Sequence, residues 1–86
     1  MKTIEKLRNH KSSQCHVEIE NGKTVFVSYS TAVIFIITRA GKRFVECTGT
    51  YSQTTRKQIG WFLKEYLPEF SYYDMKNIVG KGEVEM

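Results

Sequence analysis

The stretch TGTYSQTTRKQIGWFLKEYLP, residues 48–68, is where the sequence pattern changes from strand to helix. Before Gly49 the apolar residues recur with a period of two, which is typical of β-strands. After it they fall at i, i+3, i+4, i+7 and i+8, which is one face of an α-helix: Ile59, Phe62, Leu63, Tyr66 and Leu67. Pro68 disfavours helical geometry in the residue before it and has no N–H to donate. We therefore predict a helix over residues 52–67 that lies on a sheet formed by the preceding residues.

The start of this helix is rich in hydroxyl groups, and two interpretations of them are open. Ser52, Thr54 and Thr55 stand where the first N–H groups of a helix need partners, so one of them can serve as the N-cap. Alternatively, these N–H groups form an anion site together with Arg56 and Lys57. Capping is favoured, because the stretch lacks the glycine-rich approach that phosphate-binding loops use.

Upstream, QCHVEIENGKTVFVSYS, residues 14–30, predicts a β-hairpin whose register depends on its turn. A two-residue loop, Asn21-Gly22, would place the charge of Glu18 on the same face as Val25. A three-residue loop over residues 20–22, with a bulge at the glycine, instead pairs Val17 with Val25 and gives one fully apolar face. We predict the second register.

A second hairpin follows in AVIFIITRAGKRFVECTG, residues 32–49, with its corner at Gly41-Lys42. Its first strand, residues 33–38, is apolar on both faces, as expected of a central strand that is at least partly covered on both sides. Its second strand covers residues 43–48. The two hairpins predict a four-stranded antiparallel sheet.

Beyond the long helix, Ser71 as N-cap, Asp74 three residues later and Gly80 as a stop predict a second, short helix. Residues 81–86 have too little apolar content to pack, which indicates a flexible tail. Near the N-terminus, residues 3–10 predict a helical turn or two with Ile4 and Leu7 facing inward. The expected fold is α+β, with a single domain over residues 1–80.

Composition limits the classes of function. A chain of 86 residues with 41% hydrophobic and 26% charged residues is typical of one soluble globular domain. Its longest apolar run, residues 32–37, is too short to span a bilayer, and no apolar stretch follows the N-terminal cations, so we expect no membrane association, no secretory signal and a cytoplasmic location. Cys15 and Cys47 lack metal or redox spacing and are interpreted as buried apolar residues.

Trp61 is the sharpest candidate for a partner-binding residue. It lies nearly opposite the centre of the helix's apolar stripe, between Lys57 at i−4 and Lys64 at i+3. In one interpretation the segment 70–79 folds back and covers the indole with aromatic side chains. In the other the indole is exposed beside two cations, which is the composition of a protein-binding hot spot. The partner-binding residues predicted on the second interpretation are Trp61, Lys57, Lys64, Tyr72 and Tyr73.

The alternative class is nucleic-acid binding, which the net charge of +4 and its clustering suggest. The basic residues expected to contact phosphates are Arg39, Lys42 and Arg43 at a hairpin tip, with Arg56 and Lys57 at the start of the long helix.

Neither a catalytic group nor a metal site is predicted. His10, His16 and the two cysteines are not spaced as metal ligands, and His16 follows Cys15 on a strand, so the two point to opposite faces and cannot form a dyad. We expect no enzymatic activity and no cofactor. An exposed edge at the first strand leaves two oligomeric states open, a monomer or a homodimer formed by strand addition.

Residues 27–63, VSYSTAVIFIITRAGKRFVECTGTYSQTTRKQIGWFL, resemble small phage-encoded domains of unknown function. The likeness rests on SY-x-T-x-V, a glycine corner, and YS-x-TT-x-x-x-I running into a helix. The matching residues are Ser28, Tyr29, Thr31, Val33, Gly41, Tyr51, Ser52, Thr54, Thr55 and Ile59. The resemblance implies a small phage protein in a bacterial cytosol. The expected function is therefore non-catalytic binding to a surface of a host protein, with inhibition of a bacterial defence system as the expected outcome.

Overall fold

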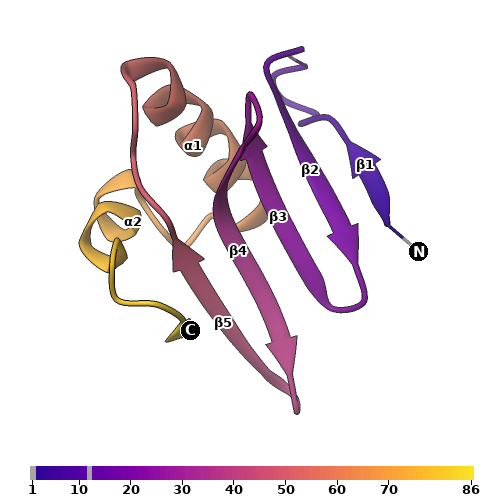
Figure 1. Cartoon of the computed structure of the whole chain (residues 1–86), viewed down its shortest axis with the longest axis vertical. Coiled ribbons are helices and arrows are strands. Elements are labelled where there is room, and N and C mark those ends of the chain that lie inside the picture. The colour runs from indigo at the N-terminus through magenta and orange to yellow at the C-terminus, as the bar shows by residue number, and fades with distance from the viewer. Residues whose placement is uncertain (1, 12) are drawn as a thin grey trace.

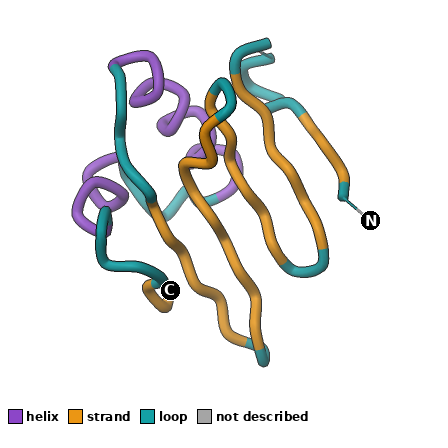
Figure 2. The backbone as a smooth tube through the Cα atoms, in the orientation of Figure 1, coloured by secondary structure: helices purple, strands orange, loops and turns teal. Residues whose placement is uncertain are grey.

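A computed structural model describes residues 2–11 and 13–86, so Met1 and Ser12 of the predicted domain lie outside the described residues. The fold has two layers, a six-stranded antiparallel sheet and two helices on one of its faces (Figures 1 and 2). The strands follow one another across the sheet in chain order. The elements are β1 (Thr3–Glu5), β2 (Cys15–Glu20), β3 (Lys23–Ser28), β4 (Thr31–Arg39), β5 (Lys42–Cys47), α1 (Gln53–Tyr66), α2 (Tyr72–Ile78) and β6 (Val84–Glu85).

The predicted α+β class, the antiparallel pairing and both helices are confirmed, whereas the prediction of four strands is wrong. One of the two strands that were not predicted is β1, which pairs with β2 at residues where a helical turn was expected. A helix there would leave one edge of β2 without backbone partners, and the β-branched Thr3 and Ile4 favour a strand. Leu7 is buried as predicted, but the side chain of Ile4 is 63% exposed.

The other strand that was not predicted, β6, lies in the segment that the sequence pattern assigns to a flexible tail. In β6, Val84 pairs with Val45 and Glu85 with Phe44. Backbone hydrogen bonds to β5 compensate for the low apolar content of this segment, and Val84 also packs against the core.

The register of the first hairpin differs from the prediction. Glu20 pairs with Lys23 and Glu18 with Val25, so the loop has two residues, not three. Asn21 and Gly22 have φ of 41° and 77°, and a turn with two positive φ values is the tight turn whose twist matches antiparallel strands. Turn geometry therefore outweighed the alignment of apolar side chains.

The core lies between the sheet and the helices. Phe26 stacks on Phe62 of α1 with 4.8 Å between ring centroids, and Phe62 stacks on Tyr66 at 4.9 Å. The predicted helical stripe is confirmed, since Ile59, Phe62, Leu63 and Leu67 are buried and Tyr66 packs against the core. Both cysteines are buried as predicted, and burial raises the pKa of the Cys47 thiol.

Capping explains the hydroxyl-rich start of α1. Ser52 is the N-cap, and its Oγ accepts from the N–H of Thr55 at 3.2 Å. In α2, Ser71 and Asp74 form the predicted capping box. The helix boundaries therefore follow from the local sequence.

A buried polar network joins the same helix to the sheet. Ser28 of β3 donates through Oγ to Gln58 Oε1, and its Oγ lies 3.2 Å from Thr55 Oγ1. All three side chains are almost fully buried. Because buried polar atoms are costly without partners, this network positions the N-terminal half of α1 over β3.

We expect Ser28→Ala to lower the free energy of unfolding by about 1–3 kcal/mol, because it leaves the buried amide of Gln58 without its donor. Urea denaturation followed by circular dichroism measures the change. Ser30→Ala is the matched control, since Ser30 is exposed. Equal stabilities of the two variants would show that the network does not hold the helix.

Candidate functional site

No cluster suited to metal chemistry is formed by residues 2–11 and 13–86, in which no three His, Cys, Asp or Glu side chains gather. His16 Nε2 lies 2.9 Å from Glu18 Oε2 on the sheet face away from the helices, whereas Cys15 is buried in the core. In the same described part of the chain, neither helix is long and apolar enough to cross a membrane.

Trp61 is half-buried beneath residues 7–10, which we call the N-terminal strap. The imidazole of His10 stacks on the indole with 4.1 Å between centroids and 4° between planes. The backbone N–H groups of Arg8 and Asn9 donate to Glu65 Oε1 at 2.7 and 3.2 Å. The strap thus lies against α1 at Trp61 and Glu65, with its Leu7 buried in the core.

Because of the strap, Trp61 is neither covered by residues 70–79 nor fully exposed, the two states that the sequence left open. The ring that stacks on it comes from His10, not from residues 70–79, and it leaves the indole only partly open. No local signal predicts this contact, because His10 precedes Trp61 by more than fifty residues and the strap follows a strand that was itself missed.

Three of the predicted partner-binding residues meet where α1 begins beside α2. The guanidinium carbon of Arg56 lies 4.8 Å from the centroid of the Tyr72 ring, and Tyr73 meets Tyr72 edge-on at 5.7 Å. An open hollow of about 580 Å³ is lined by Gln53, Arg56, Lys57 and Tyr72. Tyr73 is 67% exposed. We call Arg56, Lys57, Tyr72 and Tyr73 the tyrosine–cation cluster.

The other two predicted partner-binding residues lie further along α1. Trp61 is one turn beyond Lys57, and Lys64 is exposed in the last turn of the helix. All five predicted residues therefore belong to the helical layer, but only Lys57, Tyr72 and Tyr73 belong to the cluster.

The basic residues of the nucleic-acid alternative form two separate groups. Arg39, Lys42 and Arg43 lie at the β4–β5 turn, and Arg56 and Lys57 lie at the start of α1, at the other end of the molecule (Figure 1). Arg39 also forms an ion pair with Glu83, and its guanidinium carbon is 5.2 Å from the centroid of the Phe44 ring. A continuous basic surface is not assembled from these five residues.

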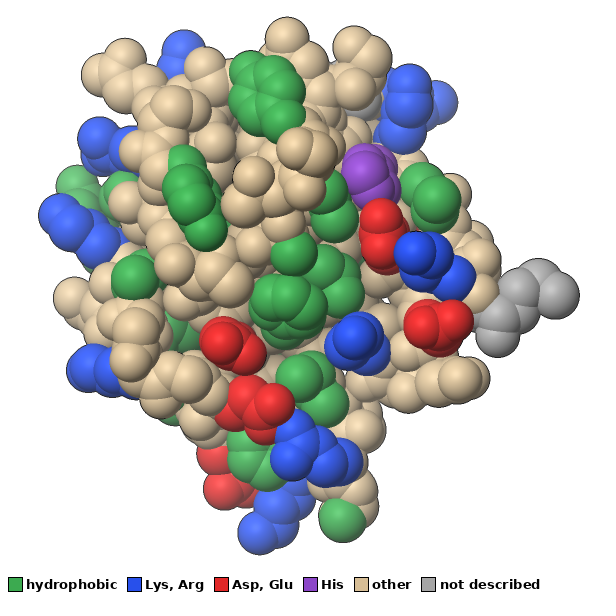
Figure 3. Space-filling view, viewed as in Figure 1, with side chains coloured by type: hydrophobic (Ala, Val, Ile, Leu, Met, Phe, Trp, Pro, Cys, Tyr) green, Lys and Arg blue, Asp and Glu red, His purple; other side chains and the backbone are tan. Residues whose placement is uncertain are grey.

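A second candidate surface is the side of the sheet away from the helices. Apolar side chains gather at its centre, and charged side chains of both signs surround them (Figure 3). Val25 and Val27 are only 7% exposed, whereas Ala32, Phe35, Ile37 and Phe44 are half-buried. We call these six residues the open sheet face. Sequence analysis missed its valines because the predicted hairpin register placed them on the core side.

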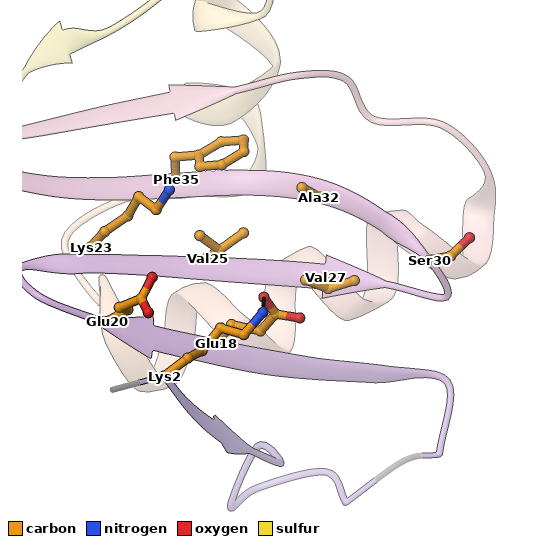
Figure 4. Close-up of a pocket in the computed structure, with 9 residues that line it drawn as sticks. All are labelled: Lys2, Glu18, Glu20, Lys23, Val25, Val27, Ser30, Ala32 and Phe35. Atoms are coloured by element: carbon orange, nitrogen blue, oxygen red, sulfur yellow. Dashed lines mark ion pairs between the residues drawn. The ribbon is translucent and has the colours of Figure 1, made fainter.

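The open sheet face is hollowed between β2 and β4 (Figure 4). The hollow measures about 330 Å³, with Val25, Val27, Ala32 and Phe35 among its lining residues and Lys2, Glu18, Glu20 and Lys23 at its charged side. Hydrogen bonds from His16 and Lys2 lower the pKa of the Glu18 carboxyl. The Nζ of Lys23 lies 5.9 Å from the centroid of the Phe35 ring.

Residues 2–81 match a family of unknown function (DUF8033). No curated protein and no solved structure matches the chain. The surfaces just described are therefore the basis for a functional proposal.

We expect His10→Ala to move the fluorescence emission of Trp61, the only tryptophan, to longer wavelength, because the indole loses its stacking partner. The same change should lower the free energy of unfolding by about 0.5–1.5 kcal/mol. His16→Ala is the matched control, since His16 lies on the other side of the sheet. An emission spectrum of His10→Ala that equals that of the native protein would contradict the strap contact.

Proposed function

The chain belongs to the DUF8033 family, and we propose that it is a non-catalytic protein-binding domain that occupies a surface of a partner protein through the tyrosine–cation cluster. The observation that carries the proposal is the ring of Tyr73. Two-thirds of this side chain is open to solvent, although it is held in edge contact with Tyr72. Tyrosine and arginine are enriched among the residues that dominate binding energy at protein interfaces.

Rigidity supports this assignment, because a side chain that is already ordered loses little entropy on binding. Tyr72 is held between Arg56 and Tyr73, and the helix that carries both tyrosines begins with a capping box. Met75, two residues after Tyr73, is fully buried and anchors α2 to the core. The partner therefore meets an aromatic surface that is preorganised.

The charge of the cluster indicates the chemistry of the partner. Arg56 and Lys57 lie in the first half of α1, and the first turn of the helix contains no acidic residue. We propose that the partner presents carboxylates to these cations around an apolar pocket for Tyr73, because complementary charge steers association and sets orientation. Lys64 and the open part of Trp61 extend the same helical surface.

The likeness of residues 27–63 to phage-encoded domains supports a bacterial host protein as the partner. We propose that binding takes place in the bacterial cytosol and blocks a component of a defence system. Blocking by occupation needs no catalytic group, so it fits a surface built from aromatic rings and cations.

Single-stranded nucleic acid is a second candidate, because stacked rings beside cations also bind bases and phosphates. The contact between Arg56 and Tyr72 favours it. Of the basic residues in the alternative prediction, only Arg56 and Lys57 belong to this cluster, whereas Arg39, Lys42 and Arg43 lie around the β4–β5 turn.

We expect Tyr73→Ala to lose the partner without loss of stability, because an exposed ring contributes binding area but little folding energy. Immobilised native protein and variants are used to capture proteins from a bacterial lysate, with identification by mass spectrometry. Tyr29→Ala is the matched control, since Tyr29 is also exposed but belongs to the β3–β4 turn. The proposal fails if Tyr73→Ala and Tyr29→Ala capture the same proteins as the native chain.

The nucleic-acid candidate is tested on the same proteins by mobility shift of a single-stranded oligonucleotide at low salt. Binding that weakens steeply with salt and is lost in Arg56→Glu would show that the partner is nucleic acid and not a protein. Nuclease treatment of the lysate before capture separates direct protein contacts from contacts through nucleic acid.

A further inference from the structure

The open sheet face is apolar at positions that no helix or strand of the described residues, 2–11 and 13–86, covers. In β3 the outward Val25 and Val27 alternate with the inward Phe26, and in β4 the outward Phe35 and Ile37 alternate with Ile34 and Ile36. Strands that are apolar on both sides are typical of sheets covered on both faces. Here α1 and α2 both pack against the inward face, and neither lies on the outward one.

We propose that a second copy of this chain covers the open sheet face, so that two sheets pack face to face as a homodimer with the helices outside. Face-to-face packing of twisted antiparallel sheets, about 10 Å apart, is a common way to bury such surfaces. The resulting dimer differs from one formed by strand addition at β1, because its contacts are side chains from the centre of the sheet.

The available area is sufficient for a specific dimer. The molecule measures 33 × 31 × 22 Å, and Figure 1, viewed along the shortest axis, shows that the sheet occupies its broad side. The sheet has six strands, and the four longer ones, β2–β5, have six residues or more. With strands about 4.8 Å apart, its face measures roughly 500 Å² per copy. Pairing two such faces buries about 1,000 Å² in total, which is where specific interfaces begin.

Charge also permits self-association through this face. The chain carries +4 overall, and like net charge opposes dimerisation. The strand registers and ion pairs, however, place basic and acidic side chains in similar numbers on this side, besides His16. They are Lys2, Lys23, Arg39 and Lys42 with Glu18, Glu20, Glu46, Glu83 and Glu85.

Two of these cations already lie on the apolar surface. Lys23 is placed against the ring of Phe35 and Arg39 against that of Phe44. Their stems therefore contribute apolar area while their charged ends remain at the rim. A rim that carries both charges does not repel an identical rim on a second copy. A surface that binds nucleic acid would instead be uniformly basic.

Dimerisation through the sheet would direct the two helical layers outward. Each dimer would then present two tyrosine–cation clusters, which raises the apparent affinity for a partner with two sites. The dimer itself does not depend on the proposed function, because it uses the opposite face of the molecule.

Sedimentation velocity of the full chain over 1–200 µM tests the proposal. We expect the mass to rise with concentration from 10.0 kDa towards twice that value. Ala32→Arg adds a long side chain to the open side without removing a core contact, and Phe35→Lys removes an apolar side chain from the same surface. Each should raise the dimer dissociation constant at least tenfold, while Tyr73→Ala, on the helical layer, should leave it unchanged.

Circular dichroism and urea denaturation establish that both variants remain folded, and Ala32→Arg remains informative if Phe35→Lys unfolds. A native chain that stays monomeric at 200 µM would overturn the proposal. A dimer that persists in both folded variants would also overturn it and assign the contact to another surface, such as the edge of β1. If the native chain is monomeric and the captured partner protects the amides of β3 and β4 from exchange, the face belongs to that partner instead.

Discussion

A sheet has two faces, and this chain has enough helix to cover only one of them. The apolar stripe of α1 and the single buried methionine of α2 cover the inward side of β2–β5. Two features of the surface follow from that constraint. The outward side of the sheet keeps Phe35, Ile37 and Phe44 only half-buried, and Trp61 of α1, which packs partly against the core, is half-buried under the N-terminal strap. Among residues 2–11 and 13–86, which the structure describes, no further helix or strand covers either surface.

The junction between sheet and helix shows how polar residues serve this arrangement. Ser28, Thr55 and Gln58 are buried between β3 and α1, and their mutual hydrogen bonds position the helix in a way that apolar contacts alone do not. Ser28, Ser52 and Thr55 also belong to the SY-x-T and YS-x-TT motifs of the sequence, so this part of the pattern has a structural explanation. The tyrosines of the same pattern differ, since Tyr29 and Tyr51 are exposed and have φ of 57° and 52°. They lie in the turns that directly precede β4 and α1.

The two surfaces left open have different chemistry and suit different tasks. The tyrosine–cation cluster is basic, with a preorganised ring, and is suited to a partner that supplies carboxylates and a pocket. The open sheet face is apolar with a balanced rim, and it is suited to an identical surface. Because they lie on opposite layers, occupation of one leaves the other free. The arrangement would allow the proposed self-association and the proposed binding of a target at the same time.

The sequence by itself determined every element whose signal is local. The period change after Gly49, the caps at Ser52 and Ser71 and the stop at Pro68 define both helices, and Gly41 defines a turn, because each depends on residues within a few positions. Lys57, Tyr72 and Tyr73, which the sequence singled out as candidates, lie together at the tyrosine–cation cluster. Only the tertiary structure decided the strands β1 and β6 and the contact of His10 with Trp61. Short edge strands and stacking across more than fifty residues depend on which backbone edges and side chains remain without partners once the centre has folded, and no local pattern records that. The register of the first hairpin, which places Val25 and Val27 on the open sheet face, instead follows from the local Asn21-Gly22 turn.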